Sequence, residues 1–156
     1  MAWIRSGKEI QVPGEEPSLH QYGCMAHIRE FEQVQPNFFR VVCQGGLRFE
    51  LDSVAPGPLG VWQGQVKYLP QDLEVELPPH LQAHADRLGK VISSAQKQGV
   101  IDRLPIYAPY LLDQCGWLAN RYAEAMPLEP EVKLTLLIES DPLKRMEAIA
   151  SLIEEK

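Results

Sequence analysis

The stretch Gly23–Leu51, GCMAHIREFEQVQPNFFRVVCQGGLRFEL, decides how the first part of this chain folds. Two runs of alternating apolar residues flank a polar loop, EQVQPN, which carries Pro36 and Asn37. Because side chains alternate along a strand, each run turns one set of side chains to one face. These sets are Cys24, Ala26 and Ile28 on the first run, and Phe39, Val41 and Cys43 on the second. The pattern predicts a β-hairpin that packs this face on a core.

A pair of glycines follows the second run. Gly45 and Gly46 tolerate the positive φ that a tight turn demands, so they predict a turn between two strands. The next strand then covers Arg48 to Val54, with Phe49 inward and Arg48 on the opposite face. We expect Arg48 to be solvated, as most arginines are, rather than to bind a ligand.

Short strands with turn signals continue on both sides of this stretch. Before it, Trp3-Ile4 and Ile10–Val12 flank Ser6-Gly7-Lys8 and predict a compact hairpin. After it, Pro56-Gly57-Pro58 breaks the chain, since proline cannot donate to a β-ladder, and Val61–Leu69 resumes as a strand. Several short strands at this spacing are typical of a small barrel or sandwich.

The second half of the chain has the periodicity of helices. One apolar stripe runs from Leu81 and predicts a helix that Gly99 ends; the stripe consists of Ala85, Leu88, Ile92 and Ala95. A second helix is expected over about 111–126, closed by Pro127. Its inward side chains are predicted to be Leu112, Trp117, Leu118, Tyr122 and Ala125.

Two further helices are predicted to start at prolines. Pro130 stands at the first turn of one, and Asp141-Pro142 caps and starts the other. The apolar face of the last helix is predicted to hold Leu143, Met146, Ile149, Ala150 and Ile153. Strands that precede helices predict an α+β chain, with a β subdomain over residues 1–78 and a helical subdomain over 79–156.

Composition narrows the class of protein. The net charge is −6, and the basic residues are scattered, which disfavours nucleic acid and anionic membranes as partners. No apolar run approaches the roughly 20 residues of a membrane span. The three cysteines are widely spread, which favours a reduced, cytoplasmic setting over a disulfide framework. The expected partner is a protein or a small molecule.

No motif in the chain carries catalysis or binds a cofactor, so we expect neither enzyme activity nor a resident cofactor. His80 and His84 stand four positions apart near a helix start, which could place both rings on one face. Asp86 alone is weak support for a third ligand, so we expect no metal site. Cys115 lies near a helix start that could lower the pKa of its thiol, yet a buried cysteine beside Trp117 is the favoured interpretation.

One surface is a candidate binding site. By strand alternation, Met25, Phe31 and Phe38 fall on the side of the hairpin away from Cys24 and Cys43. Exposed apolar side chains grouped in this way mark protein-binding patches. The alternative is that a helix or a further strand covers them.

These elements together resemble the N-terminal, substrate-binding domain of the Lon protease. The matching segments are IRSGKE, YGCMAHIREFEQ, CQGGLRFEL and VKYLP, followed by the helical CGWLANRYAEAMPLEPEVKLTLLIESDPLKRMEAI. The resemblance covers about Ile4 to Ile149. It implies a PUA-like β pseudo-barrel followed by a C-terminal helical bundle.

The resemblance also implies a function. It predicts a non-catalytic module that recognises unfolded or tagged polypeptides, as an adaptor in protein quality control, since neither an ATPase nor a Ser-Lys peptidase motif is present. PUA-like barrels also serve RNA-modifying proteins, so binding of a small ligand or RNA is the alternative function. Family members begin with a Leu-Pro-Leu-Phe-Pro-like strand, a bend and a helix that this sequence lacks, which is explained by a misassigned start, by a trimmed chain or by a true short form that dimerises. Without these elements a sheet edge and part of the core would be exposed, so we expect the short chain to self-associate, as a homodimer.

Overall fold

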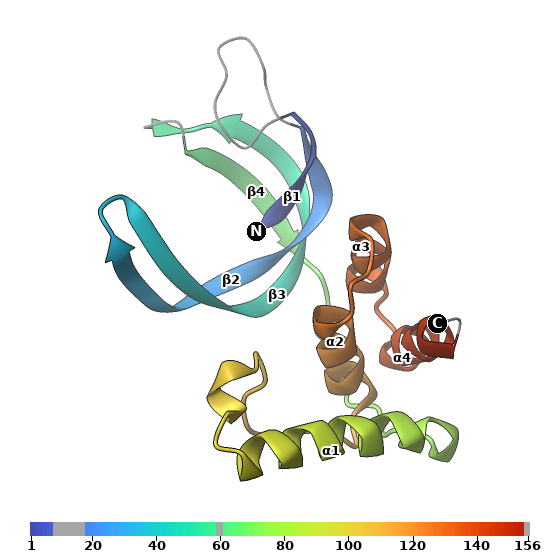
Figure 1. Cartoon of the computed structure of the whole chain (residues 1–156). Coiled ribbons are helices and arrows are strands. Elements are labelled where there is room, and N and C mark those ends of the chain that lie inside the picture. The colour runs from blue at the N-terminus through green and yellow to red at the C-terminus, as the bar shows by residue number, and fades with distance from the viewer. Residues whose placement is uncertain (8–17, 59–60, 155–156) are drawn as a thin grey trace. The chain divides into compact units, whose positions relative to one another are not determined.

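The computed structural model describes residues 1–7, 18–58 and 61–154 of the chain (Figure 1). Contacts divide it into two compact units, Met1–Gln71 and Asp72–Lys156. The first unit consists of strands and the second of helices, which confirms the predicted α+β class.

The first unit is one antiparallel sheet with the strand order β1-β2-β3-β4. Its strands are β1 (Ala2–Ser6), β2 (Ser18–Gln35), β3 (Phe38–Pro56) and β4 (Trp62–Tyr68). The long β2 and β3 form a strongly curved ribbon, and β1 and β4 pair with only one part of it (Figure 1). The predicted strand at 61–69 is confirmed, whereas Ile10–Val12 lies outside the described residues.

The predicted turn at Gly45 and Gly46 is wrong, because β3 runs through both glycines without a break. Cys24 pairs with Arg48, and Ala26 pairs with Gly45. Between these two pairs β3 contains one residue more than β2, and the extra residue forms a bulge. A Cβ on Gly46 would lie 2.8 Å from Cδ2 of His27. Gly46 therefore serves the close approach of two strands rather than a turn, whereas a Cβ on Gly45 would make only an ordinary contact with Cys24 Sγ at 3.5 Å.

The loop at the hairpin tip is shorter than predicted. Strand pairing continues to Gln35 and Phe38, and only Pro36 and Asn37 form the turn. Asn37 has a φ of 61°, which asparagine tolerates better than most residues, and proline suits the position before it. Residues 32–35 thus belong to β2, and the ribbon that β2 and β3 form extends almost to the hairpin tip.

The second unit contains four α-helices among the described residues. They are α1 (Gln82–Lys97), α2 (Cys115–Ala125), α3 (Pro130–Ile138) and α4 (Pro142–Glu154), with the short 3-10 turns η2 (Pro79–Leu81) and η3 (Ile101–Arg103). The stripe predicted for α1 is buried as expected, and Gly99 follows the helix with a φ of 68°. Proline begins α3 and α4 at the predicted positions.

The helix α2 begins at Cys115, later than predicted. The backbone before it pairs instead with an extended segment: Leu77 N donates to Asp113 O at 2.7 Å, and Cys115 N donates to Val75 O at 2.9 Å. Residues 111–114 therefore form a turn, closed by the hydrogen bond from Gln114 N to Leu111 O at 3.1 Å, and Gln114 then forms an isolated antiparallel bridge with Glu76. The predicted inward residue Ala125 is exposed, while Ala119 is fully buried.

The helices enclose one apolar core that also contains a charged side chain. The largest buried side chains include Leu118, Met146 and Ile149, each 0% exposed. Arg145, on α4 beside Met146, is only 2% exposed. An isolated buried charge costs several kcal/mol, so Arg145 requires partners that compensate it.

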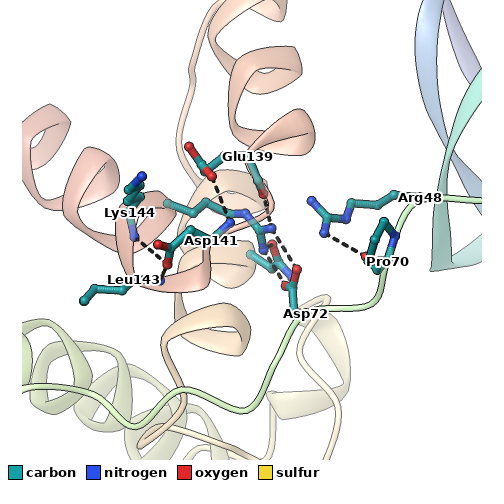
Figure 2. A network of polar contacts seen from close by, with 9 residues as sticks. Arg48, Pro70, Asp72, Glu139, Asp141, Leu143 and Lys144 are labelled. Atoms are coloured by element: carbon teal, nitrogen blue, oxygen red, sulfur yellow. Dashed lines mark hydrogen bonds and ion pairs between the residues drawn. The ribbon is translucent and has the colours of Figure 1, made fainter.

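Asp72 supplies the compensating charge for Arg145. The guanidinium donates from Nη1 to Oδ2 of Asp72 at 2.6 Å and from Nη2 to Oδ1 at 2.9 Å, a bidentate pair. Nη1 also donates to Oδ1 of Asn120 at 3.2 Å, and Nη2 donates to the backbone oxygen of Glu139. One side chain thus connects the segment before α1 with α2, the end of α3 and α4 (Figure 2).

A second carboxylate fixes the start of α4 beside this pair. Asp141 Oδ1 accepts from Leu143 N at 2.9 Å and from Lys144 N at 3.4 Å, as the sequence predicts for a capping aspartate (Figure 2). Asp141 N in turn donates to Oε1 of Glu139 at 2.8 Å. The turn between α3 and α4 is therefore held by side chains as well as by its backbone.

We expect Asp72→Ala to destabilise the chain by about 3–5 kcal/mol, because the buried Arg145 charge loses its compensating carboxylate. The measurement is urea unfolding followed by circular dichroism. The matched control is Glu124→Ala, which removes the partly exposed 3.0 Å pair with Arg121 and should cost less than about 1 kcal/mol. Equal losses for the two variants would contradict the compensating role of Asp72.

Candidate functional site

The hairpin of β2 and β3 contains a bulge that decides which of its side chains share a face. Ile28 pairs with Cys43, and Glu30 pairs with Val42, so two residues of β2 oppose one residue of β3. Arg29 is the extra residue. Because side chains alternate, one extra residue moves everything beyond it on β2 to the opposite face.

Phe31 therefore lies on the face predicted to be the inner one. It pairs with Val41, and its ring stacks on that of Phe39, with centroids 5.1 Å apart and an interplanar angle of 29°. Phe38 neighbours Phe39 on a regular strand, so it points to the other face. The predicted grouping of Met25, Phe31 and Phe38 on one face is thus wrong: Phe31 is separated from the other two.

Four large apolar side chains instead form what we call the apolar hairpin face. Ile28 and Phe31 are each 64% exposed, Phe39 is 47% exposed and Val41 is 44% exposed. Strand alternation and the register place all four on one side of the ribbon. Exposed apolar side chains that are contiguous in this way are typical of interaction sites. Sequence reasoning missed three of them, because it assigned their face to the core.

The opposite face of the same ribbon is charged. Arg40 Nη2 lies 2.8 Å from Oε2 of Glu32 and 3.8 Å from Oε2 of Glu30. At the bulge, Arg29 Nε donates to Oε1 of Gln44 at 2.6 Å. The ribbon is therefore amphipathic, with Phe38 as an exposed apolar residue on the charged side.

Cys115 lacks the properties of a nucleophile. The side chain is 0% exposed, and Sγ donates to the backbone oxygen of Glu76 at 3.5 Å. Burial raises the pKa of the thiol above its usual 9.0, and the nearby charge of Asp141 raises the pKa further. Both effects oppose formation of the thiolate that a nucleophilic cysteine requires.

The histidines are not arranged as metal ligands. His80 Nε2 lies 3.9 Å from Oε1 of Glu147, whereas His84 is buried, with its ring edge-on to Tyr122 at 6.1 Å. No group of three potential ligands occurs within residues 1–7, 18–58 and 61–154. Nor is any helix in this part of the chain long and apolar enough to cross a membrane.

A shallow hollow of about 570 Å³ runs along α1. Its polar lining mixes charges of both signs and hydroxyl groups, with Asp86, Lys90 and Lys97 beside Ser93 and Ser94. This lining favours no particular ligand class. The apolar hairpin face therefore remains the stronger candidate for a binding site.

A four-stranded antiparallel sheet followed by a helical unit is the fold of Lon N-terminal domains. The family model of the ATP-dependent protease La (LON) substrate-binding domain matches residues 3–155, so the chain belongs to this family. This result confirms the resemblance that the sequence predicted. A search of curated proteins found no match.

Solved structures give the same result. The chain is similar to a Lon N-terminal domain protein from Xanthomonas campestris, with 26% identity and a TM-score of 0.66 over 85% of this chain and 68% of that chain. It also resembles the N-terminal domain of the Lon protease of the Mycobacterium avium complex, at 18% identity and a TM-score of 0.56, over 88% and 72% of the two chains. The second likeness supports the fold alone.

We expect the stability of the helical unit to fall as the pH rises above about 9. Burial raises the pKa values of Cys115 and Tyr122 above 9.0 and 10.0, so the folded chain keeps protons that the unfolded chain has released. Their contribution to stability is complete below pH 9 and is lost as the pH rises through the folded pKa values. Urea unfolding between pH 7 and 11 measures this slope.

The control for this pH dependence is the double variant Cys115→Ala, Tyr122→Phe. It loses the thiol and the phenol, whose hydroxyl donates to His84 O at 2.8 Å, so it should be less stable at pH 7. Above pH 9 its stability should fall less steeply than that of the natural chain. The same slope for both proteins would show that these two groups do not titrate as described.

Proposed function

We propose that this chain is a non-catalytic module that binds unfolded or extended polypeptide segments, acting as a recognition component in protein quality control. The observation that carries the proposal is the apolar hairpin face. Ile28, Phe31, Phe39 and Val41 are all at least 44% exposed, and they form one surface on a long β-ribbon. Unfolded segments differ from folded proteins chiefly in exposing apolar side chains, which such a surface can bury.

Membership of the family supports this proposal. The matching family model describes a substrate-binding domain of a protease, and the substrates of a protease are polypeptides. We further propose that the chain acts as an adaptor, which presents the polypeptides that it binds to the quality-control machinery. We place it in the cytoplasm on the grounds of its scattered, reduced cysteines.

The chemistry of the face suits a binder with broad sequence tolerance. Full burial of a phenylalanine side chain contributes about 1.5–3 kcal/mol of free energy, and this contribution does not depend on the orientation of the group that covers it. The stacked rings of Phe31 and Phe39 restrain each other, so they lose little further freedom on binding. A partner would gain affinity from each apolar side chain that it places on the face, whatever its identity.

Binding of RNA has less support. Phosphate recognition requires a basic surface, because affinity depends on the release of counterions from the phosphates. The charged side of the ribbon carries Glu30 and Glu32 against Arg40, and the whole chain has a net charge of −6. These charges repel a phosphate backbone.

We expect Phe31→Ser and Phe39→Ser each to weaken the binding of reduced, carboxymethylated α-lactalbumin about five- to tenfold, because each removes one ring from the face. Fluorescence anisotropy of the labelled probe measures the affinity. The matched control is Phe38→Ser, on the opposite face and 62% exposed, which should change the affinity less than twofold.

Thermal unfolding should show that all three variants remain folded, since each residue is exposed. Equal weakening by Phe38→Ser would instead support the grouping with Met25 that the sequence first indicated. Unchanged affinity in all three variants would place the binding surface elsewhere.

A further inference from the structure

The strand β3 has a long edge that no other described strand covers. From Phe38 to Gly45 it pairs with β2 on one side. On the other side, β4 pairs only with the later part of β3, from Phe49↔Tyr68 to Pro56↔Trp62. The sheet order β1-β2-β3-β4 provides no further described strand for the earlier part of β3. Its outward backbone N–H and C=O groups therefore have no strand partner among the described residues.

The two edges of the ribbon differ in how well they resist an added strand. The edge of β2 is interrupted by register shifts between Ile28 and Glu30 and between Gln33 and Gln35. It also carries charged side chains, namely Arg29, Glu30 and Glu32. Bulges and charges are the devices by which proteins prevent strand addition at an edge. The edge of β2 is thus protected.

The edge of β3 lacks these devices. Both shifts place their extra residue on β2, so β3 is regular from Phe38 to Gly45. Its sequence at 38–43 is FFRVVC, which contains one charge, Arg40, and neither proline nor glycine. Aromatic and β-branched residues of this kind favour strand pairing. The edge is suited to accept an extended segment.

We propose that the β3 edge from Phe39 to Gly45 binds an extended, proline-free polypeptide segment as an added β-strand. This inference rests on the proposed function and specifies how the polypeptide is held: by backbone hydrogen bonds to β3, as in β-strand addition. Alternate side chains of the segment then extend the apolar hairpin face beside Phe39 and Val41. The remaining side chains lie on the charged face beside Arg40.

Charge selects the residue that the segment places opposite Arg40. On one side Arg40 lies 2.8 Å from the carboxylate of Glu32, and its side chain is 62% exposed. A carboxylate on the added strand would complete an alternating row of negative, positive and negative groups across three strands. A lysine at the same place would face a like charge, which destabilises a cross-strand pair. The segment is therefore apolar on one face and carries an acidic residue on the other.

The test uses the acetylated and amidated peptide Thr-Val-Thr-Val-Glu-Val-Thr-Val-Thr and two N-methylated analogues. In one analogue the valine amides are methylated, and in the other the remaining amides are. Successive N–H groups of a strand point to opposite edges, so only one analogue loses the donors that face β3. We expect one analogue to bind more than tenfold more weakly than the parent peptide, and the other to bind within twofold of it.

Replacing the glutamate of the peptide by lysine should weaken binding roughly three- to tenfold, and Arg40→Glu in the protein should reverse this preference. The control is Lys67→Glu, a charge reversal on β4, which should leave the preference unchanged. A preference that Arg40→Glu does not alter would overturn the placement of the acidic residue opposite Arg40.

The failure of this inference is distinguishable from failure of the proposed function. If both analogues bind like the parent peptide, or if both lose binding, recognition does not use one edge of the segment, and strand addition is wrong. Binding of carboxymethylated α-lactalbumin would in that case still support the proposed function. If neither the peptide nor the unfolded protein binds, both proposals fail. If sedimentation shows that the chain dimerises and that dilution to monomer is required for peptide binding, a second copy occupies the edge, and the stated occupant is wrong.

Discussion

The surface of the first unit depends on one extra residue in a β-strand. With Arg29 inserted between the pairs Ile28↔Cys43 and Glu30↔Val42, β2 changes the face to which its later side chains point. Phe31 then meets Phe39 and Val41, and the two glutamates meet Arg40. Without the bulge, Phe31 would lie on the charged face, and Glu30 and Glu32 would lie beside Phe39 and Val41, so the apolar face would be interrupted by charges. The amphipathic character of the hairpin is thus a consequence of register.

The helical unit depends on a different constraint, the buried charge of Arg145. A bidentate pair with Asp72, an amide oxygen of Asn120 and the backbone oxygen of Glu139 surround it. A hydrophobic residue in its place would pack as well, but it would not fix the positions of four separate segments by directional bonds. We interpret Arg145 as the residue that determines how α4 meets α2 and the segment before α1.

Local sequence patterns allowed much of this fold to be predicted. Contacts between residues far apart in the sequence could not be predicted in this way. The stripe of α1, the proline starts of α3 and α4 and the Asp141 cap each lie within a few positions, so the sequence alone indicates them. The bulge at Arg29 has no such signal, because only the partner strand reveals an extra residue. For the same reason the sequence indicated a turn at Gly45-Gly46 where two strands approach closely. Asp72 and Arg145 are 73 positions apart, so no local pattern in the sequence indicates that they form an ion pair.

The most direct test of the binding account is amide hydrogen exchange of the chain with and without saturating carboxymethylated α-lactalbumin. An amide exchanges more slowly once it donates a hydrogen bond to a partner or is shielded by one. The account predicts slower exchange in peptides that cover residues 28–45 of the hairpin, with little change in α1 to α4. Protection confined to the helices, with the hairpin unchanged, would contradict it.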